Sequence, residues 1–251
     1  KQKGSYRIYS RKQDNNFMIA VLGDGFLATE VIGQTGWSHF SRREDGIDFN
    51  NIKTIDRILP KNCNTVVNCI ANTDTYSENR ESMLRTNYES IIELVKLCNK
   101  RKISLIHYST DYVYAGSVSN AKETDIPIPD RTWYAYSKLL ADEYIISNSN
   151  DYLIVRGSHR ISPFPYDKAW SNQIGNFDSV DVLVLQWIKL IESGETGVWN
   201  IGTHDKSVYD LAILSNDRTE PAMAPPHFPL NTTMDLSKIN EFLEKYEDIN
   251  G

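Results

Sequence analysis

Residues 17–28 have the sequence FMIAVLGDGFLA. The six apolar residues 17–22 predict a buried strand, which runs directly into a turn containing Gly23 and Gly25. Ala28 completes a G-x-G-x-x-A spacing, and the pattern up to about Ile32 predicts a short helix. These residues therefore predict the first strand–turn–helix unit of an α/β protein.

The turn has the composition of a dinucleotide-binding site. Gly23 permits the tight turn, Gly25 lets the backbone approach a pyrophosphate, and Ala28 allows the helix to pack closely on the strand. The helix N-terminus would present free N–H groups to the phosphates. A plain glycine turn is the structural alternative. We expect cofactor contacts from the residues of this turn, which are Gly23, Gly25, Phe26, Leu27 and Ala28.

Strand and helix patterns alternate along the rest of the chain. Further strands are expected at residues 37–40, 65–70, 103–107, 152–156 and 198–201. Helices are expected at 52–59, 78–100, 132–147 and 182–191, and from about 235. This alternation predicts βαβ units, and therefore an α/β fold with a Rossmann-type doubly wound parallel sheet.

The predicted elements suggest a division of the chain. Residues 17–156 and 180–201 are expected to form an NAD(P)-binding Rossmann domain, and residues 157–179 with 202–251 a small, discontinuous C-terminal substrate-binding lobe. Residues 1–16 are polar and charged. They are interpreted either as a flexible extension or as residues added ahead of a native start at Met18.

Composition excludes several classes of protein. The chain has 251 residues, a net charge of -6 and no basic cluster, which argues against a nucleic-acid partner. No apolar run approaches the roughly 20 residues that span a bilayer, so no membrane partner is expected. Three cysteines without C-x-x-C spacing, and no visible signal peptide, suit a cytoplasmic protein. Without a persuasive acidic cluster, we expect no catalytic metal.

The residues after the second strand bear on the choice of nicotinamide cofactor. An NAD site usually has Asp or Glu there, to bind the ribose hydroxyls. This chain has Ser41, Arg42 and Arg43, whose hydroxyl and guanidinium groups suit a 2′-phosphate. NADP is therefore predicted. NAD stays an alternative. A solvated charged loop is the structural alternative, because Glu44 and Asp45 follow directly.

Two later strand ends carry residues that suit ligands. Cys69, Ile70 and Ala71 end one strand with small or apolar side chains, which suit the adenosine–ribose half of a cofactor. Thr110 follows the next strand, at the sheet edge where ligands bind, and is predicted to hydrogen-bond a substrate carbonyl. A core strand entering a turn and a capping threonine are the respective alternatives.

Tyr134 and Lys138 form a Y-x-x-x-K pair near the start of a predicted helix. Residues i and i+4 lie on one helix face, so both side chains can reach the same point. An ammonium near a phenol lowers its pKa from about 10 and makes it a better proton donor at neutral pH. A surface Tyr–Lys pair is the alternative interpretation.

Together these features resemble the short-chain dehydrogenase/reductase superfamily, and in particular its extended branch that modifies nucleotide sugars. Residues 109–116, STDYVYAG, are similar to the signature of the dTDP-4-dehydrorhamnose reductase family. Residues 66–71, 154–156 and 229–238 are also similar to that family, so the resemblance runs from about Met18 to the C-terminal region.

The resemblance implies NADP-dependent reduction of a 4-keto group on a nucleotide-linked deoxysugar. It gives Tyr134 the role of proton donor, Lys138 that of ribose ligand, and Thr110 that of stabilising the carbonyl oxygen. Asn87 matches an asparagine that supports a water relay in the superfamily. Tyr112 distinguishes the chain from 4,6-dehydratases, which have Glu there. The expected substrate contacts are Thr110, Asp111, Tyr112, Arg156, Ser158 and His159.

Two other functions stay open. The chain is otherwise interpreted as a sugar-nucleotide epimerase of the same branch, or as a non-catalytic NADP-binding regulatory subunit. Residues 157–179 and 202–251 look short for the family, which favours the regulator. The intact Thr110, Tyr134 and Lys138 set favours an enzyme. The helices at 78–100 and 132–147 offer a surface for a homodimer, and the oligomeric state stays open.

Overall fold

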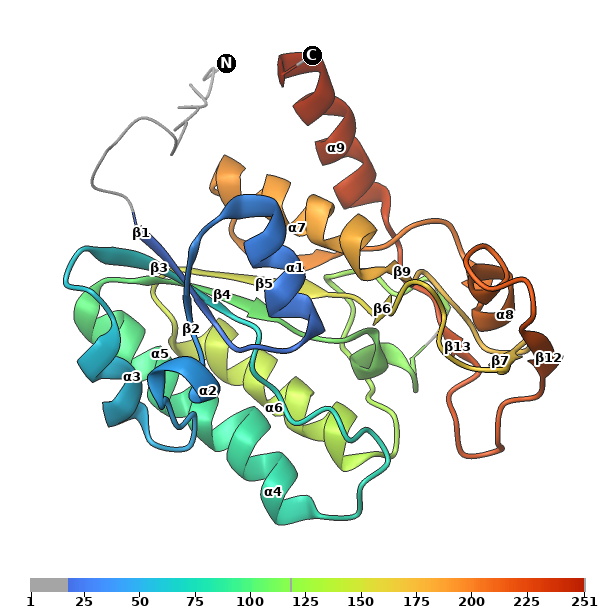
Figure 1. Cartoon of the computed structure of the whole chain (residues 1–251), viewed down its shortest axis with the longest axis horizontal. Coiled ribbons are helices and arrows are strands. Elements are labelled where there is room, and N and C mark those ends of the chain that lie inside the picture. The colour runs from blue at the N-terminus through green and yellow to red at the C-terminus, as the bar shows by residue number, and fades with distance from the viewer. Residues whose placement is uncertain (1–17, 118, 251) are drawn as a thin grey trace.

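The computed structural model describes residues 18–117 and 119–250. The expectations for residues 1–16, and for Phe17 in the first strand, lie outside the described residues. The described part contains a central six-stranded parallel sheet in the order β10-β5-β4-β3-β1-β2 (Figure 1). Its strands are β1 Met18–Leu22, β2 Ser38–Phe40, β3 Cys63–Asn68, β4 Ser104–Tyr108, β5 Tyr152–Arg156 and β10 Gly197–Asn200.

Helices cover both faces of this sheet (Figure 1). The first face packs its buried apolar residues against α3 Ile52–Ile58, α5 Ser90–Arg101 and α6 Trp133–Asn148. The second packs against α1 Phe26–Thr35, α7 Val180–Ser193 and α9 Ser237–Asn250. The prediction of an α/β fold with a doubly wound parallel sheet is confirmed.

The strands run from buried apolar residues into a polar edge. Side chains alternate between the two faces, so Leu22 joins the α5–α6 side and Val21 the α1–α7 side. β1 pairs with β2 on one side and with β3 on the other, which makes the β1–β3 boundary the point where strand order reverses. In open α/β sheets, ligands bind outside the carboxyl ends of the strands at such a point.

Some helices differ from their expected lengths. α1 spans ten residues and ends at Gly36 in the left-handed region, so it is longer than the short helix predicted. The long helix expected at residues 78–100 consists of α4 Arg80–Leu84, a π-helical turn η2 Arg85–Glu89, and α5. α2 Arg42–Asp45 is a single turn directly after β2. The sequence pattern identified α1 and the helix at 78–100, but caps and the π turn set their ends, and α2 was not predicted.

The segments after β5 form a smaller cluster beside the sheet (Figure 1). Its apolar centre includes Phe164, Phe177, Val208 and Leu211. Its elements are β6 His159–Arg160, β7 Lys168–Trp170, β8 Ile174–Gly175, β9 Asp178–Ser179, β11 Lys206–Ser207, α8 Val208–Ala212, β12 Glu220–Ala222 and β13 Asn231–Thr232.

Helix α9 falls in the expected lobe by sequence but packs elsewhere. Its residues Ile239, Phe242 and Leu243 belong to the same apolar cluster as α7 and β10. We therefore propose that the lobe consists of residues 157–179 and 202–234. Across the residues that the structure describes, every helix is too short or too polar to span a membrane.

Candidate active site

A cavity of about 470 Å³ opens at the carboxyl ends of the central strands. Residues from the β1–α1 turn, the end of β3, the end of β4, helix α6 and the end of β5 share it. They are Gly23, Asp24, Gly25, Phe26, Leu27, Cys69, Ile70, Ala71, Thr73, Thr75, Tyr108, Ser109, Thr110, Tyr112, Tyr134, Lys138, Gly157, Ser158, His159 and Arg160. The fold thus gathers most of the predicted site residues around one space.

The glycine turn keeps the near side of this cavity open. Gly23 has φ +118°, and a Cβ there would lie 3.2 Å from the Ile70 side chain. Gly25 caps α1 from an extended conformation, and a Cβ there would meet no atom within 4 Å. No side chain caps α1 and its first turn has no acidic residue, so its terminal N–H groups suit an anion. Ala28 is fully buried and acts in helix packing, away from the cavity surface.

The residues after β2 lie outside the cavity lining. The Ser41 side chain is fully buried, and its Oγ accepts a hydrogen bond from the Glu44 N–H at 3.1 Å, which caps α2. Arg42 and Arg43 are exposed. The Arg43 Nε lies 3.7 Å from the Asp24 carboxylate, which lines the cavity. Of the three predicted 2′-phosphate ligands, Ser41 is therefore committed to a helix cap.

Thr110 and Tyr134 lie together on the cavity wall. Thr110 begins the 3₁₀ helix η3 Asp111–Tyr114 and accepts the Tyr112 N–H at 3.3 Å. Thr132 caps α6 by accepting the Ala135 N–H at 3.2 Å, and so fixes the start of the helix that carries Tyr134. Burial raises the pKa of Tyr134 above its ordinary value, although a hydrogen bond with Thr110 acts in the opposite direction.

Lys138 is held by the sheet beneath it. It is 2% exposed, and its Nζ donates to the Tyr108 carbonyl at 2.7 Å and lies 3.0 Å from Nε2 of His107. Burial lowers the pKa of Lys138 to about 8. The expectation that Lys138 depresses the pKa of Tyr134 is wrong in this structure, because desolvation of the phenol outweighs the other effects and the Lys138 Nζ is engaged with His107 and Tyr108.

Asn87 lies in the π-helical turn η2 and is 2% exposed. Its Oδ1 accepts the Asn72 N–H at 2.7 Å, and its Nδ2 donates to the Asn72 carbonyl at 3.0 Å and to Ser137 Oγ at 3.1 Å. Such single turns of π helix occur frequently at functional sites. Here the turn aims Asn87 at the loop after β3 and at the residue before Lys138.

Two predicted substrate ligands do not line the cavity. The Arg156 guanidinium is 1% exposed and donates to Asp142 at 2.9 Å and to the Tyr114 hydroxyl at 2.6 Å. Asp111 is also 1% exposed and accepts the Thr110 hydroxyl at 3.2 Å. The predictions of Arg156 and Asp111 as substrate ligands are corrected, because both side chains are bonded inside the protein.

The other predicted substrate residues do face the cavity. Tyr112, Ser158 and His159 line it. The Tyr112 hydroxyl lies 3.2 Å from that of Tyr76. Burial, followed by the charge of Arg160, lowers the pKa of His159 to about 4, so its ring is neutral at physiological pH.

The structure adds several residues to the site that the motifs predict. His107 and Asn68 lie behind Lys138, and Ser109 bonds Asp142 at 2.9 Å. Arg160 brings a cation to the cavity, with its Nη1 donating to Ser158 Oγ at 2.7 Å. A polar residue at the end of an otherwise apolar strand was the available signal for His107 and Asn68, since parallel strands end at the same edge.

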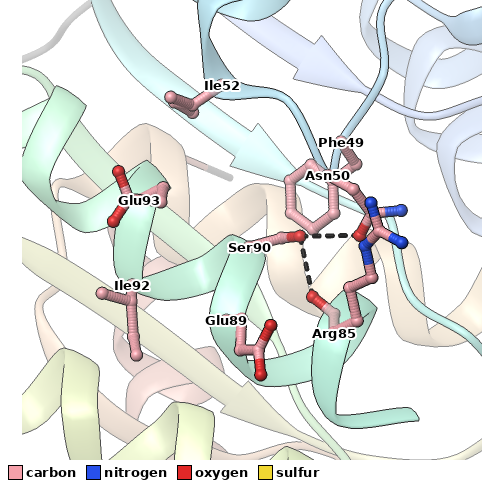
Figure 2. A pocket seen from close by; sticks show the side chains of 8 residues that line it. All are labelled: Phe49, Asn50, Ile52, Arg85, Glu89, Ser90, Ile92 and Glu93. Carbon is pink, nitrogen blue, oxygen red and sulfur yellow. Dashed lines mark hydrogen bonds between the residues drawn. The ribbon is translucent and has the colours of Figure 1, made fainter. Parts of the chain in front are cut away.

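A second cavity of about 370 Å³ lies between the segment before α3 and helix α5 (Figure 2). The Ser90 Oγ lies 2.9 Å from both Asn50 Oδ1 and the Arg85 carbonyl oxygen, and its one hydroxyl hydrogen can be donated to either. It shares no lining residue with the first cavity. Within the part of the chain that the structure describes, no group of three or more His, Cys, Asp or Glu is arranged to hold a metal ion.

Known proteins resemble this chain both in sequence and in fold. A probable low-salt glycan biosynthesis reductase of Haloferax volcanii is 32% identical over 114 residues, which span 44% of this chain and 38% of that relative. The chain thus matches less than two-fifths of the length of that relative.

Solved structures with the same fold include three dTDP-4-dehydrorhamnose reductases. That of Clostridium acetobutylicum has a TM-score of 0.75 at 20% identity, with 92% of this chain and 99% of that chain covered. That of Bacillus anthracis, in complex with NADP, has a TM-score of 0.74 at 18% identity, with 90% and 91% covered. The hypothetical reductase of Sulfolobus tokodaii has a TM-score of 0.73 at 19% identity, with 89% and 94% covered.

These structures lend no support to the expectation of a shortened lobe, because the matched fold takes in at least 91% of each of those chains. Residues 18–161, more than half of the chain, match the family described as the RmlD substrate binding domain. The family predicted from the motifs is thereby confirmed: the chain belongs to the RmlD family.

Proposed function

We propose that this protein is an NADP-dependent reductase of a 4-keto group on a nucleotide-linked deoxysugar. One observation carries the proposal. The glycine turn, Thr110, Tyr134 and Lys138 line a single cavity at the carboxyl ends of the central strands. Membership of the RmlD family and the names of its relatives point to the same chemistry.

The residues around the turn fit a dinucleotide. The uncapped N-terminus of α1 offers backbone N–H groups, and the space beside Gly25 is free. NADP is the preferred cofactor because Arg42 and Arg43 follow β2 and the solved Bacillus anthracis reductase is a complex with NADP. NAD stays the alternative, and is supported by the NAD complex of a dTDP-glucose 4,6-dehydratase with the same fold. When bound, the cofactor supplies a hydride.

The chain's own residues would handle the proton and the carbonyl oxygen. The raised pKa of Tyr134 keeps its phenol protonated at neutral pH, which is the form that donates a proton. Thr110 lies within hydrogen-bonding reach of that phenol, and its hydroxyl hydrogen would turn from Asp111 Oδ1 to the same substrate oxygen and stabilise its growing negative charge. Lys138 would bind the ribose hydroxyls with the N–H that neither Tyr108 nor His107 occupies.

Arg160 and His159 extend the site toward the smaller lobe. The Arg160 guanidinium lies 4.7 Å from the Phe177 ring centroid and lines the cavity. An arginine held by stacking is suited to a phosphate group. A nucleotide-linked substrate supplies such a group, so Arg160 is the proposed diphosphate ligand.

The proposal is tested by titrating the protein with NADPH and NADH, then adding a panel of 4-keto sugar nucleotides while NADPH oxidation is followed. Tyr134→Phe should abolish turnover and leave NADPH affinity nearly unchanged, because it removes one hydroxyl and keeps the ring. Tyr136→Phe, on the exposed side of the same helix, is the matched control.

The outcomes separate the proposed function from the two alternatives. Oxidation of NADPH by one of the keto sugars supports the reductase. Interconversion of sugar isomers without net loss of NADPH supports an epimerase. Tight cofactor binding without turnover of any substrate supports a regulatory subunit.

A further inference from the structure

Three buried side chains connect the sheet to Lys138. Asn68 ends β3 and His107 lies beside it on β4, and the two are partners in the strand register. Asn68 Nδ2 lies 3.1 Å from His107 Nδ1, and His107 Nε2 lies 3.0 Å from Lys138 Nζ. Each of the three side chains is at most 2% exposed. The proposed mechanism uses Lys138 but assigns nothing to the two residues behind it.

The backbone fixes which end of the Asn68 amide faces the imidazole. The Ile70 N–H can only donate, and it lies 3.2 Å from Asn68 Oδ1. The amide therefore presents its NH₂ to His107, and Nδ1 must accept. A neutral imidazole that accepts at Nδ1 carries its proton at Nε2. That proton points at Lys138.

Two N–H groups cannot bond to each other, so this arrangement requires Lys138 to accept as a neutral amine. An ammonium at Lys138 requires the other tautomer, with the proton on Nδ1 and an acceptor facing it. The Asn68 amide must then turn its oxygen to His107, which leaves the Ile70 N–H without its acceptor. The second arrangement holds one proton more than the first: Nζ has three hydrogens and the ring proton is on Nδ1.

We propose that Asn68 and His107 are positioning residues that anchor Lys138 and couple its proton to the tautomer of the imidazole and the orientation of the amide. Asn68 favours the neutral amine because only that arrangement satisfies the Ile70 N–H. Two residues of the sheet, Asn68 and His107, thus determine whether Lys138 is charged.

The groups around Lys138 are consistent with this coupling. His107 faces it from β4, Cys69 from the segment after β3, and Asp142 from its own helix. Burial, with the charge of Lys138, holds the pKa of His107 well below its ordinary value, so the ring changes tautomer without becoming charged. Burial also raises the pKa of the Cys69 thiol, which keeps it neutral. Asp142 is the nearby carboxylate, and Arg156 pairs with it.

Nitrogen NMR of the imidazole tests the coupling on the whole chain without cofactor or substrate. The ¹⁵N shifts of His107 distinguish the two tautomers. We expect the Nε2–H form at pH 9.5 and the Nδ1–H form at pH 6.5, with a midpoint near the Lys138 pKa of about 8. An imidazole that keeps one tautomer over this range overturns the proposal.

Asn68→Asp sharpens the test because it keeps the shape of the side chain. A carboxylate accepts both the Ile70 N–H and the Nδ1–H, so it should hold the Nδ1–H tautomer and raise the midpoint by about one pH unit or more. Asn64→Asp, at the other end of β3, is the matched control and should leave the midpoint unchanged. An unchanged midpoint in Asn68→Asp, or an equal shift in both variants, contradicts the assignment.

A kinetic readout extends the test and rests on the proposed function. If the reductase needs the ammonium, the alkaline limb of its kcat profile should move to higher pH in Asn68→Asp by the same amount as the NMR midpoint. A merely structural role for Asn68 would lower kcat without moving that limb. Absence of any turnover would reject the proposed function, while the NMR result would still decide the coupling.

Discussion

Replacing Arg156 tests whether it is part of the scaffold or a ligand of the substrate. The side chains of Arg156 and Asp142 are 1% and 0% exposed, and their Nε–Oδ2 distance is 2.9 Å. Arg156→Leu would leave the Asp142 carboxylate buried with only the Ser109 hydroxyl, because its Oδ1 already has no protein partner. Removing one member of a buried ion pair costs about 3–5 kcal/mol of stability. This cost already includes the loss of the hydrogen bond from Arg156 to the Tyr114 hydroxyl.

Urea unfolding followed by tryptophan fluorescence measures this loss. With an m value of roughly 3 kcal/mol/M, the midpoint of Arg156→Leu should fall by about 1–1.7 M. The double variant Arg156→Leu/Asp142→Leu should recover part of the loss, since no unpaired charge stays buried. A variant with unchanged stability and a raised KM would refute the scaffold assignment and restore Arg156 as a substrate ligand.

Three further predictions concern the glycine turn, the lysine and the cofactor. Gly23→Ala should lower the free energy of unfolding by about 1–3 kcal/mol, because φ is +118° and the new Cβ would press on Ile70. The loss is measured as a fall in the thermal midpoint, with Gly33→Ala as the control. Lys138 has a lowered pKa in the folded state, so the unfolded chain binds more protons than the folded one between pH 8 and 10.5. The stability of the wild type relative to Lys138→Met should therefore rise as the pH increases over that window. The rise should be on the order of 3 kcal/mol once Lys138 is fully deprotonated. A constant difference between the two proteins would count against the buried lysine. Arg43→Ala should weaken NADPH binding by about tenfold and leave NADH binding unchanged in calorimetry, and an equal loss for both cofactors would argue against a 2′-phosphate contact.

Patterns within a single element were informative about the fold. The strand at 152–156 has the bounds predicted for it, and Thr132 caps the helix that carries Tyr134. Both depend on contacts among neighbours in sequence, namely a short apolar run and a side chain that reaches the third N–H of its own helix. The sequence pattern predicts no strand after residue 201, yet this region holds short strands, because their pairing partners lie far away in the chain, as β12 pairs with β7.

Some features of the candidate site could likewise be predicted from local sequence, and others could not. The positions of Gly23, Thr110, Tyr134 and Lys138 at one cavity follow from local motifs placed at the carboxyl ends of parallel strands. The buried state of Arg156 and the helix-capping role of Ser41 do not, because burial depends on which distant segments cover a side chain. The local inference that Lys138 lowers the pKa of Tyr134 was also wrong, because desolvation depends on all the groups that surround the phenol.

The sequence by itself determined the order of the central strands and their main helices, the glycine turn, the Y-x-x-x-K pair and the family, since each is encoded in short runs of side chains with fixed spacing. Only the tertiary structure decided that Lys138 rests on His107 and Asn68, and that Arg156 holds Asp142 instead of a substrate. Those contacts join residues 14 to 39 positions apart, and they exist because the sheet brings neighbouring strand ends together under one helix.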